Sequence, residues 1–307
     1  MAASDDDASR CLLLALSHDE LGVIFDGLAD PLQPVVAFAL SSTCLGLRTP
    51  LLTALEALWQ RHARAKALGW KAGILKTGRH GSALNRVALS CADLRDAEEL
   101  DWRDRGLTTD DMATLGLILP WMPRLKTLDL FSNGVVAGMH ALFEGLGHGA
   151  APSLCYLNCA ESDFGPAAAE TLAAALRRGA MPKLEELYLG ENGITNESVA
   201  ILAPVLKKLA ALKLVDLGMN DIADEGVASL LDNLGKDDFK TLKGLYLDGN
   251  ILSDKSCATV VAALKAGALP AIEALCHPEY DDVFSEYASA EACEAVDAAL
   301  EQRSQQH

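Results

Sequence analysis

The sequence predicts an α/β solenoid, a stack of strand–helix units with parallel strands on one face and helices on the other. Short pairs of apolar residues recur along the chain at a nearly constant period, and an asparagine follows most pairs at a fixed distance. The stretch LEELYLGENGI at 184–194 shows both features. Leu187 and Leu189 lie two positions apart, so they point to the same face of a short strand. The amide of Asn192 can satisfy backbone groups left unpaired where the chain turns away.

The repeat period is the strongest of these observations. The first apolar residue of each pair recurs at steps of 28, 29, 30, 28, 30 and 30 residues. These residues are Leu100, Leu128, Leu157, Leu187, Val215 and Leu245, with a weaker copy at Leu275. The asparagine position holds Arg105, Asn133, Ser162, Asn192, Asn220 and Asn250. Such regularity predicts stacked units over residues 95–280, each burying its apolar side chains against its neighbours.

The pattern L-x-x-L-x-L-x-x-N-x-[IL] resembles that of leucine-rich repeats. A full helix in each unit of 28–30 residues resembles the ribonuclease-inhibitor class of these repeats. Wide helices outside and narrow strands inside predict a horseshoe, with the strands on the concave face and the helices on the convex face.

The domain organisation follows from the limits of the repeats. We expect a disordered tail over 1–10, an all-helical region over 11–92, the repeats over 93–280 and a helical cap over 281–307. Residues 51–69 predict a helix that Gly69 ends, with Leu51, Leu55, Leu58 and Trp59 on one face. Trp59 and Trp70 are expected in the core.

Part of the N-terminal region resembles an F-box. Leu16-Ser17, Asp19-Glu20-Leu21, Ile24-Phe25-x-x-Leu28 and Ala39-Leu40-Ser41-x-x-Cys44-x-x-Leu47 follow the order of that motif, although Ser17 replaces its usual proline. The resemblance implies docking of a Skp-type adaptor of a cullin-based ubiquitin ligase. The residues nearest that contact would be Leu16, Leu21, Ile24, Phe25 and Leu28. The alternative is a plain helical cap on the repeats.

Each predicted strand leads into a predicted helix. The helices are expected over 108–119, 137–146, 166–178, 196–209, 224–234 and 255–266, and a further helix over 289–302 would cover the last repeat. Three returns share the sequence G-A-x-P, beginning at Gly149, Gly179 and Gly267. Glycine is suited to end a helix and proline to keep it ended. Leu84, Val87 and Leu89 predict an irregular strand before the first full repeat.

The net charge of −17 is unevenly distributed. Residues 57–92 form a basic belt with seven Lys or Arg and no acid, whereas the rest of the chain is acidic. The acidic bulk argues against nucleic-acid binding. The belt would bind an acidic partner, phosphate or a membrane surface, lie against the acidic repeats, or be a solvated face. With no secretory signal, no transmembrane segment and eight scattered cysteines, we expect an intracellular protein, cytoplasmic or nuclear.

The predicted concave face is the default binding surface, and it is set by the residues that alternate with the core positions. Nine of its positions are acidic, and Arg103 alone is basic. Aromatic side chains beside carboxylates suit recognition of a basic protein segment; the alternative is a solvated sheet whose tyrosines pack on their neighbours. The predicted partner-binding residues are Asp101, Arg103, Asp129, Phe131, Tyr156, Asn158, Glu186, Tyr188, Asp216, Tyr246 and Asp248.

The sequence predicts no catalytic residues, metal site or cofactor. The histidines lack the spacing of a metal or triad motif, and Cys159 occupies a strand core position and is expected to be buried. The predicted function is therefore non-enzymatic protein binding. The protein would recruit substrates as an adaptor, or it would be a scaffold subunit held permanently in a larger assembly.

Overall fold

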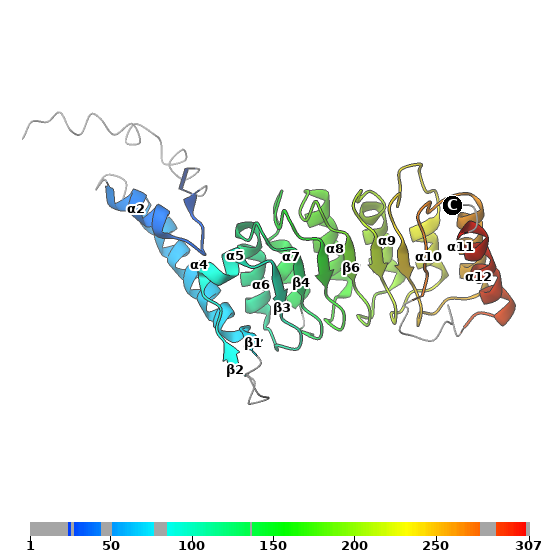
Figure 1. Cartoon of the computed structure of the whole chain (residues 1–307), viewed down its shortest axis with the longest axis horizontal. Coiled ribbons are helices and arrows are strands. Elements are labelled where there is room, and N and C mark those ends of the chain that lie inside the picture. Colours follow the sequence, from blue (N-terminus) through cyan, green and yellow to red (C-terminus); the bar gives the residue numbers. More distant parts are fainter. Residues whose placement is uncertain are drawn as a thin grey trace, which may run out of the picture. The chain divides into compact units, whose positions relative to one another are not determined.

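The computed structural model describes residues 24–25, 28–43, 51–76, 85–135, 137–276 and 287–304 (Figure 1). The chain divides into two compact units, Met1–Arg95 and Asp96–His307. The tail at 1–10, the adaptor-docking residues Leu16 and Leu21, and Leu84 lie outside the described residues.

The first unit is built on two helices, α2 (Val35–Thr43) and α4 (Leu52–Lys71). Its core contains Phe25, Ala29, Ala37, Leu51, Leu55 and Leu58. The expectation that Trp59 and Trp70 are core residues is wrong, because their exposed fractions are 57% and 75%. The buried stripe of α4 continues from Leu58 to Ala65 and Leu68, which turns Trp59 toward solvent. Its ring instead lies against that of Phe38, with the centroids 5.0 Å apart.

The prediction that Gly69 ends this helix is also wrong, because α4 continues to Lys71. A Cβ atom at this position would lie 2.4 Å from the carbonyl oxygen of Leu89. Gly69 therefore allows the backbone of residue 89 to approach the helix, and its own carbonyl accepts a hydrogen bond from the Leu89 N–H at 2.9 Å. The unit also contains an antiparallel pair, β1 (Ile74–Lys76) with β2 (Asn85–Val87), and the helix α5 (Cys91–Asp96) begins in it. The strand expected near Val87 exists, but it pairs with β1.

The second unit contains one parallel sheet of six strands in sequence order, with helices on one side of it (Figure 1). The strands are β3 (Glu99–Asp101), β4 (Thr127–Asp129), β5 (Tyr156–Asn158), β6 (Glu186–Tyr188), β7 (Leu214–Asp216) and β8 (Gly244–Tyr246). Their central residues pair in register, from Leu100 with Leu128 to Val215 with Leu245, as the period predicts. The weaker repeat at Leu275 forms only an isolated parallel bridge, between Ala274 and Gly244 of β8.

The helices that follow the strands agree with the sequence in order and differ at their ends. They are α6 (Thr109–Ile118), the short 3-10 helix η3 (Leu119–Trp121), α7 (Gly138–Glu144), α8 (Gly165–Arg177), α9 (Asn196–Leu206), α10 (Asp224–Leu231) and α11 (Asp254–Lys265). The glycines that open the G-A-x-P returns have positive φ, between 70° and 82°, as a helix C-terminus favours.

A last helix, α12 (Ala290–Ser304), covers the end of the repeats. It packs against α11 and buries Val296 and Ala299. The guanidinium of Arg303 donates to the carbonyls of Leu264 and Ala268 at 2.9 and 2.8 Å, and so satisfies acceptors at the end of α11. The helix therefore shields apolar groups that an open repeat would expose.

Four asparagines, Asn133, Asn192, Asn220 and Asn250, form most of a ladder of buried polar side chains inside the second unit. The Nδ2 group of Asn192 donates to the carbonyls of Cys159 in the preceding repeat and of Leu189 in its own, at 2.8 and 3.1 Å. Its Oδ1 accepts from the backbone N–H groups of Ser162 and Phe164 at 2.7 and 3.2 Å. Asn133, Asn220 and Asn250 are likewise buried and bonded to the preceding repeat. The amide thus satisfies backbone groups at the turn, as the sequence predicts, and it also joins each of these repeats to the preceding one.

The residue before each ladder position has a left-handed backbone. In five repeats this residue is not glycine and φ lies between 51° and 55°: Asp104, Ser132, Glu161, Glu191 and Met219. In the sixth repeat it is Gly249, with φ of 67°. A side chain in this region costs about 1–2 kcal/mol, which glycine avoids.

We therefore expect Ser132→Gly to raise the free energy of unfolding by roughly 0.5–1 kcal/mol, after the added flexibility of the unfolded chain is subtracted. Urea unfolding followed by circular dichroism measures the change. Ser153→Gly is the matched control: Ser153 has no positive φ, so this variant should be less stable than the parent. Equal effects of the two changes would contradict the assigned strain.

Candidate functional site

The strand face is the surface formed by the outward side chains of β3–β8 and of the turns that follow them. In β4 to β7 the central residue of each strand is buried and its two neighbours are partly exposed, as alternation predicts. Asp101, Arg103, Asp129, Phe131, Tyr156, Asn158, Glu186, Tyr188 and Asp216 all lie on this face with exposed or half-buried side chains. The structure thus brings together nine of the predicted partner-binding residues.

The exposure expected for Tyr246 and Asp248 is wrong, since they are only 9% and 3% exposed. Gly244 explains the position of the tyrosine. A Cβ atom there would lie 3.2 Å from Cε1 of Tyr246 and 3.3 Å from Cγ of Leu214, so the ring lies over the glycine and beside that leucine. The carboxylate of Asp248 lies against Gly218, where a Cβ atom would be 3.4 Å from its Oδ2.

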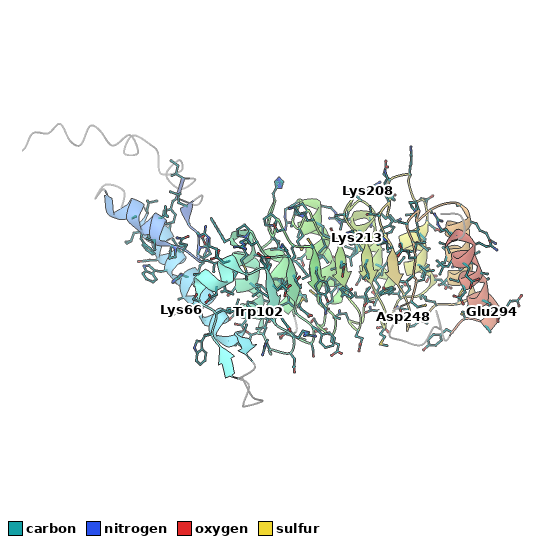
Figure 2. The ribbon with its side chains drawn as sticks, viewed as in Figure 1. Lys66, Trp102, Lys208, Lys213, Asp248 and Glu294 are labelled. Carbon is teal, nitrogen blue, oxygen red and sulfur yellow. The ribbon has the colours of Figure 1, made fainter. Side chains whose placement is uncertain are left out.

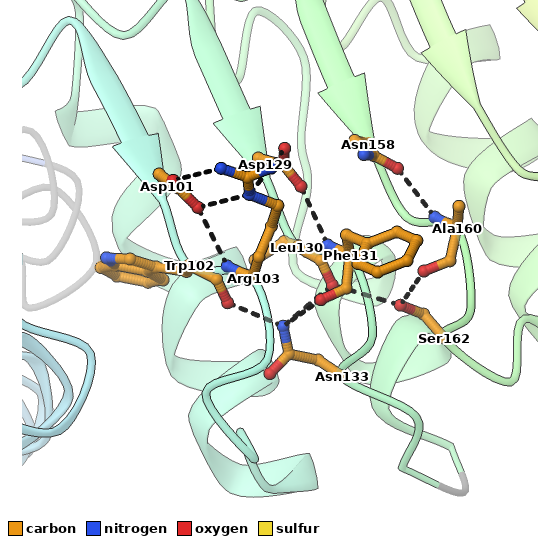
Figure 3. Close-up of polar contacts among 10 residues, drawn as sticks. All are labelled: Asp101, Trp102, Arg103, Asp129, Leu130, Phe131, Asn133, Asn158, Ala160 and Ser162. Atoms are coloured by element: carbon orange, nitrogen blue, oxygen red, sulfur yellow. Dashed lines mark hydrogen bonds and ion pairs between the residues drawn. The ribbon is translucent and has the colours of Figure 1, made fainter. Parts of the chain in front are cut away.

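In four of the six strands the residue after the central one is Asp or Asn, and it has a structural role that the sequence reasoning missed. Asp129 accepts a hydrogen bond through Oδ1 from the N–H of Phe131 at 3.0 Å, and Asn158 accepts in the same way from Ala160 at 2.9 Å (Figure 3). Asp216 does so with Gly218 at 2.8 Å. These are turns in which a side chain caps the backbone two residues further on. The recurrence of Asp or Asn at this position was the available signal.

Arg103 joins the first two strands of the face. Its Nε and second terminal nitrogen donate to the two carboxylate oxygens of Asp101 at 2.9 and 2.8 Å, and its Nε lies 3.5 Å from Oδ2 of Asp129 (Figure 3). The hydrogen bonds from Arg103 hold the pKa of Asp101 below its usual value. Burial raises the pKa of Asp129, against the opposing effect of Arg103. The cation is therefore engaged with carboxylates of its own chain.

Two tyrosines from neighbouring strands pair on the strand face. The rings of Tyr156 and Tyr188 lie 5.1 Å apart with 40° between their planes, within the range of a favourable aromatic pair. The Tyr188 hydroxyl donates to Oε2 of Glu186 at 3.1 Å. Burial raises the pKa of both phenols, so the rings present neutral π-faces.

Beside this pair the strand face is hollowed, with a cavity volume of about 460 Å³. We call this cavity the hollow. Its floor is formed by Ala160, Gly190 and Gly218, which occupy the same place in three consecutive repeats, three residues after the central strand residue. The two preceding repeats carry Arg103 and Phe131 at this place, and the following repeat carries Asp248. Three small residues flanked by larger ones explain why the surface dips here.

The lysines that precede the strands are paired with acids on adjacent segments. The ammonium nitrogen of each lysine lies close to a carboxylate oxygen of a glutamate. The distances are 2.9 Å for Lys126 and Glu98, 2.7 Å for Lys213 and Glu185, and 2.7 Å for Lys243 and Glu273. Such exposed pairs contribute little to stability. They partly neutralise these three lysines, each of which lies one residue before its strand.

Other predicted features lie elsewhere. Cys159 is fully buried, as expected, and burial raises the pKa of its thiol. Within the described ranges, no group of three or more His, Cys, Asp or Glu is arranged to hold a metal ion. Of the predicted adaptor-docking residues that are described, Ile24 is exposed, Leu28 is half-buried and Phe25 is buried in the first unit's core. The expectation of a contact through Phe25 is therefore wrong.

Comparisons with known proteins agree with the repeat architecture. A leucine-rich-repeat family model matches residues 180–203 and 211–231. No curated protein matches the sequence. Among solved structures, the leiomodin-1 actin-binding site 2 is similar over 50% of this chain and 83% of its own, with 17% identity and a TM-score of 0.41.

The fold is a leucine-rich-repeat solenoid with an N-terminal helical region. None of the helices described is long and apolar enough to cross a membrane.

Proposed function

We propose that the strand face binds a protein partner through a basic segment of that partner. The observation that carries the proposal is the excess of carboxylates around a half-buried tyrosine pair. Glu99, Glu186 and Glu191 add negative charge to the face, and the cation Arg103 is bound to Asp101. A positively charged partner surface would be attracted to this face and oriented on it. The tyrosines would supply the apolar contact that charge alone lacks.

A charge-reversal variant tests the proposal. The variant carries Glu99→Lys, Glu186→Lys and Glu191→Lys, all on the strand face. The matched control carries Glu170→Lys, Glu294→Lys and Glu301→Lys, exposed positions on the helices α8 and α12, with Glu294 labelled in Figure 2. Both variants change the net charge equally. Proteins captured from a native extract are then compared by quantitative mass spectrometry.

We expect the strand-face variant to lose at least about tenfold of the specifically captured protein, because three attractive contacts become repulsive. The control should retain it. Equal capture by the two variants would locate the partner contact away from the strand face.

The same experiment distinguishes a permanent scaffold subunit from a substrate-recruiting adaptor. A partner recovered in stoichiometric amount indicates a permanent scaffold subunit. Co-purification of a Skp-type adaptor and a cullin indicates the substrate-recruiting role that the F-box resemblance implies. The burial of Phe25 counts against docking of the adaptor through that residue.

A further inference from the structure

We propose that the hollow of the strand face receives one arginine side chain of the partner. This inference rests on the proposed function and adds to it the chemical identity of the anchoring residue. The arguments are the shape of the hollow, the rings that border it and the carboxylates at its edge.

The shape is fixed by the backbone. Ala160, Gly190 and Gly218 leave the floor open, and a Cβ atom at Gly190 would lie 3.4 Å from the carbonyl oxygen of Gly218. The floor carbonyls are already engaged: those of Gly190 and Gly218 accept from the N–H groups of Glu161 and Glu191, each at 3.1 Å. A bound group would therefore find a flat, satisfied surface below it and would interact mainly with the walls.

The walls suit a planar cation. Tyr156 and Tyr188 border the hollow with their paired rings, and Phe131 and Met219 add apolar contact. A guanidinium over the face of a tyrosine is attracted by the ring quadrupole, by about 0.5–1 kcal/mol at exposed sites and more where water is excluded. The thioether of Met219, itself 39% exposed, can adjust to the alkyl stem.

The charges at the edge favour a cation and select its geometry. Asp216 and Glu191 both line the hollow. The carboxylate of Asp216 is held in place by the Gly218 N–H at 2.8 Å, and a carboxylate can accept several hydrogen bonds at once. Arg103 also borders the hollow, but its guanidinium is bonded to Asp101. The hollow is therefore lined by two carboxylate groups next to aromatic rings.

Arginine fits this combination better than lysine. Its guanidinium is planar, stacks on aromatic rings and donates two parallel hydrogen bonds to a carboxylate. The ammonium of lysine is compact and strongly hydrated, so it has no planar face to stack on the rings and cannot form the bidentate pair.

The test uses three fluorescein-labelled peptides of sequence KGKGXGKGK, in which X is arginine, lysine or citrulline. The four flanking lysines supply the basic character that the proposed function requires, and X alone examines the hollow. Fluorescence anisotropy gives the dissociation constants. We expect the arginine peptide to bind about tenfold more tightly than the other two, from stacking and the charge-assisted hydrogen bonds together.

Two variants examine the site itself. Ala160→Leu fills the floor, and Tyr188→Ala removes one wall. Each should reduce the preference for arginine to less than about twofold while binding of the lysine peptide stays within about twofold, because the flanking lysines act through charge. Tyr287→Ala, an exposed tyrosine outside the sheet, is the matched control and should keep the full preference. Circular dichroism of each variant confirms that the repeats are folded.

The outcomes separate the two proposals. Equal binding of the three peptides, with loss of that binding in the Glu99, Glu186 and Glu191 variant, would refute the arginine site and keep the basic partner. A preference for arginine that survives both Ala160→Leu and Tyr188→Ala would also refute it. No binding of any peptide would refute the proposed function, and the arginine site with it.

Discussion

Replacing Gly116 by alanine is expected to lower the free energy of unfolding by about 3 kcal/mol, the cost of forcing an extra carbon into a closely packed contact. Gly116 lies in α6, where a Cβ atom would be 2.3 Å from the carbonyl oxygen of Leu142 in α7. That neighbour is backbone, so it can move only if the helix moves. Gly145, at the end of α7, faces Gly116 in return, with 3.1 Å between its would-be Cβ and the Gly116 carbonyl carbon. The two helices thus approach through glycines.

The sign of this effect is informative, because alanine favours a helix over glycine by about 1 kcal/mol. At an uncrowded position the same change would be neutral or stabilising. Gly147→Ala is the matched control, since a Cβ atom there meets nothing within 4 Å and its φ is not positive. Thermal and urea unfolding measure both variants. If Gly116→Ala were as stable as Gly147→Ala, the conclusion that α6 and α7 are in close contact at Gly116 would be contradicted.

Asn192→Leu is expected to destabilise the protein by about 3 kcal/mol, the upper end of the cost of leaving buried polar groups without partners. The leucine would occupy a similar volume but would leave the carbonyl of Cys159 and the N–H groups of Ser162 and Phe164 without the amide. Because these groups are buried, water cannot replace it.

Asn158→Leu is the control for this prediction. Asn158 lies on the strand face and caps the N–H of Ala160. Its loss should cost about 1 kcal/mol, as for an ordinary hydrogen bond. Urea unfolding at constant protein concentration gives both values. If both variants lost the same free energy of unfolding, the buried ladder would stabilise the protein no more than an ordinary surface hydrogen bond does.

The sheet could be predicted from the sequence because the repeat period alone determines the register of its strands. The spacing from Leu100 to Leu245 determines which residues pair, and the pairing determines which side chains point outward. The burial of Asn192 and Cys159 follows from the same count. Helix ends were less accurate: α9 ends at Leu206 and not at 209, since no strong stop signal lies there.

The hollow and its limits could not be predicted, because they depend on side chains in several repeats at once. Gly190 alone does not predict a hollow in the surface. The surface dips there because Ala160 and Gly218 are also small and Phe131 is large. Likewise, the ring of Tyr246 is covered because Gly244 leaves room for it to lie flat over the strand. Alternation correctly identified the outward positions of the strands, but it says nothing of how a long side chain lies on the surface.

The prediction of an adaptor contact through Phe25 is wrong for a related reason. Phe25 fits a motif of apolar residues, and such a motif does not tell a docking side chain from a core one. In the structure it packs with Ala37 and Leu51 in the first unit. Trp59 shows the converse error, since one more residue along α4 moves a side chain by about 100° around the helix axis.

One rung of the asparagine ladder is a serine, and this gives the solenoid a mechanical weak point. The Ser162 hydroxyl lies 3.2 Å from the carbonyl of Leu130 and 3.0 Å from that of Ala160, yet it has a single hydrogen to share between them. Every asparagine amide has two. A pulling force along the axis would therefore part the second repeat from the third before it separated the repeats joined through Asn192 and Asn220. The boundary would leave the tyrosine pair and the floor of the hollow together in one undivided block.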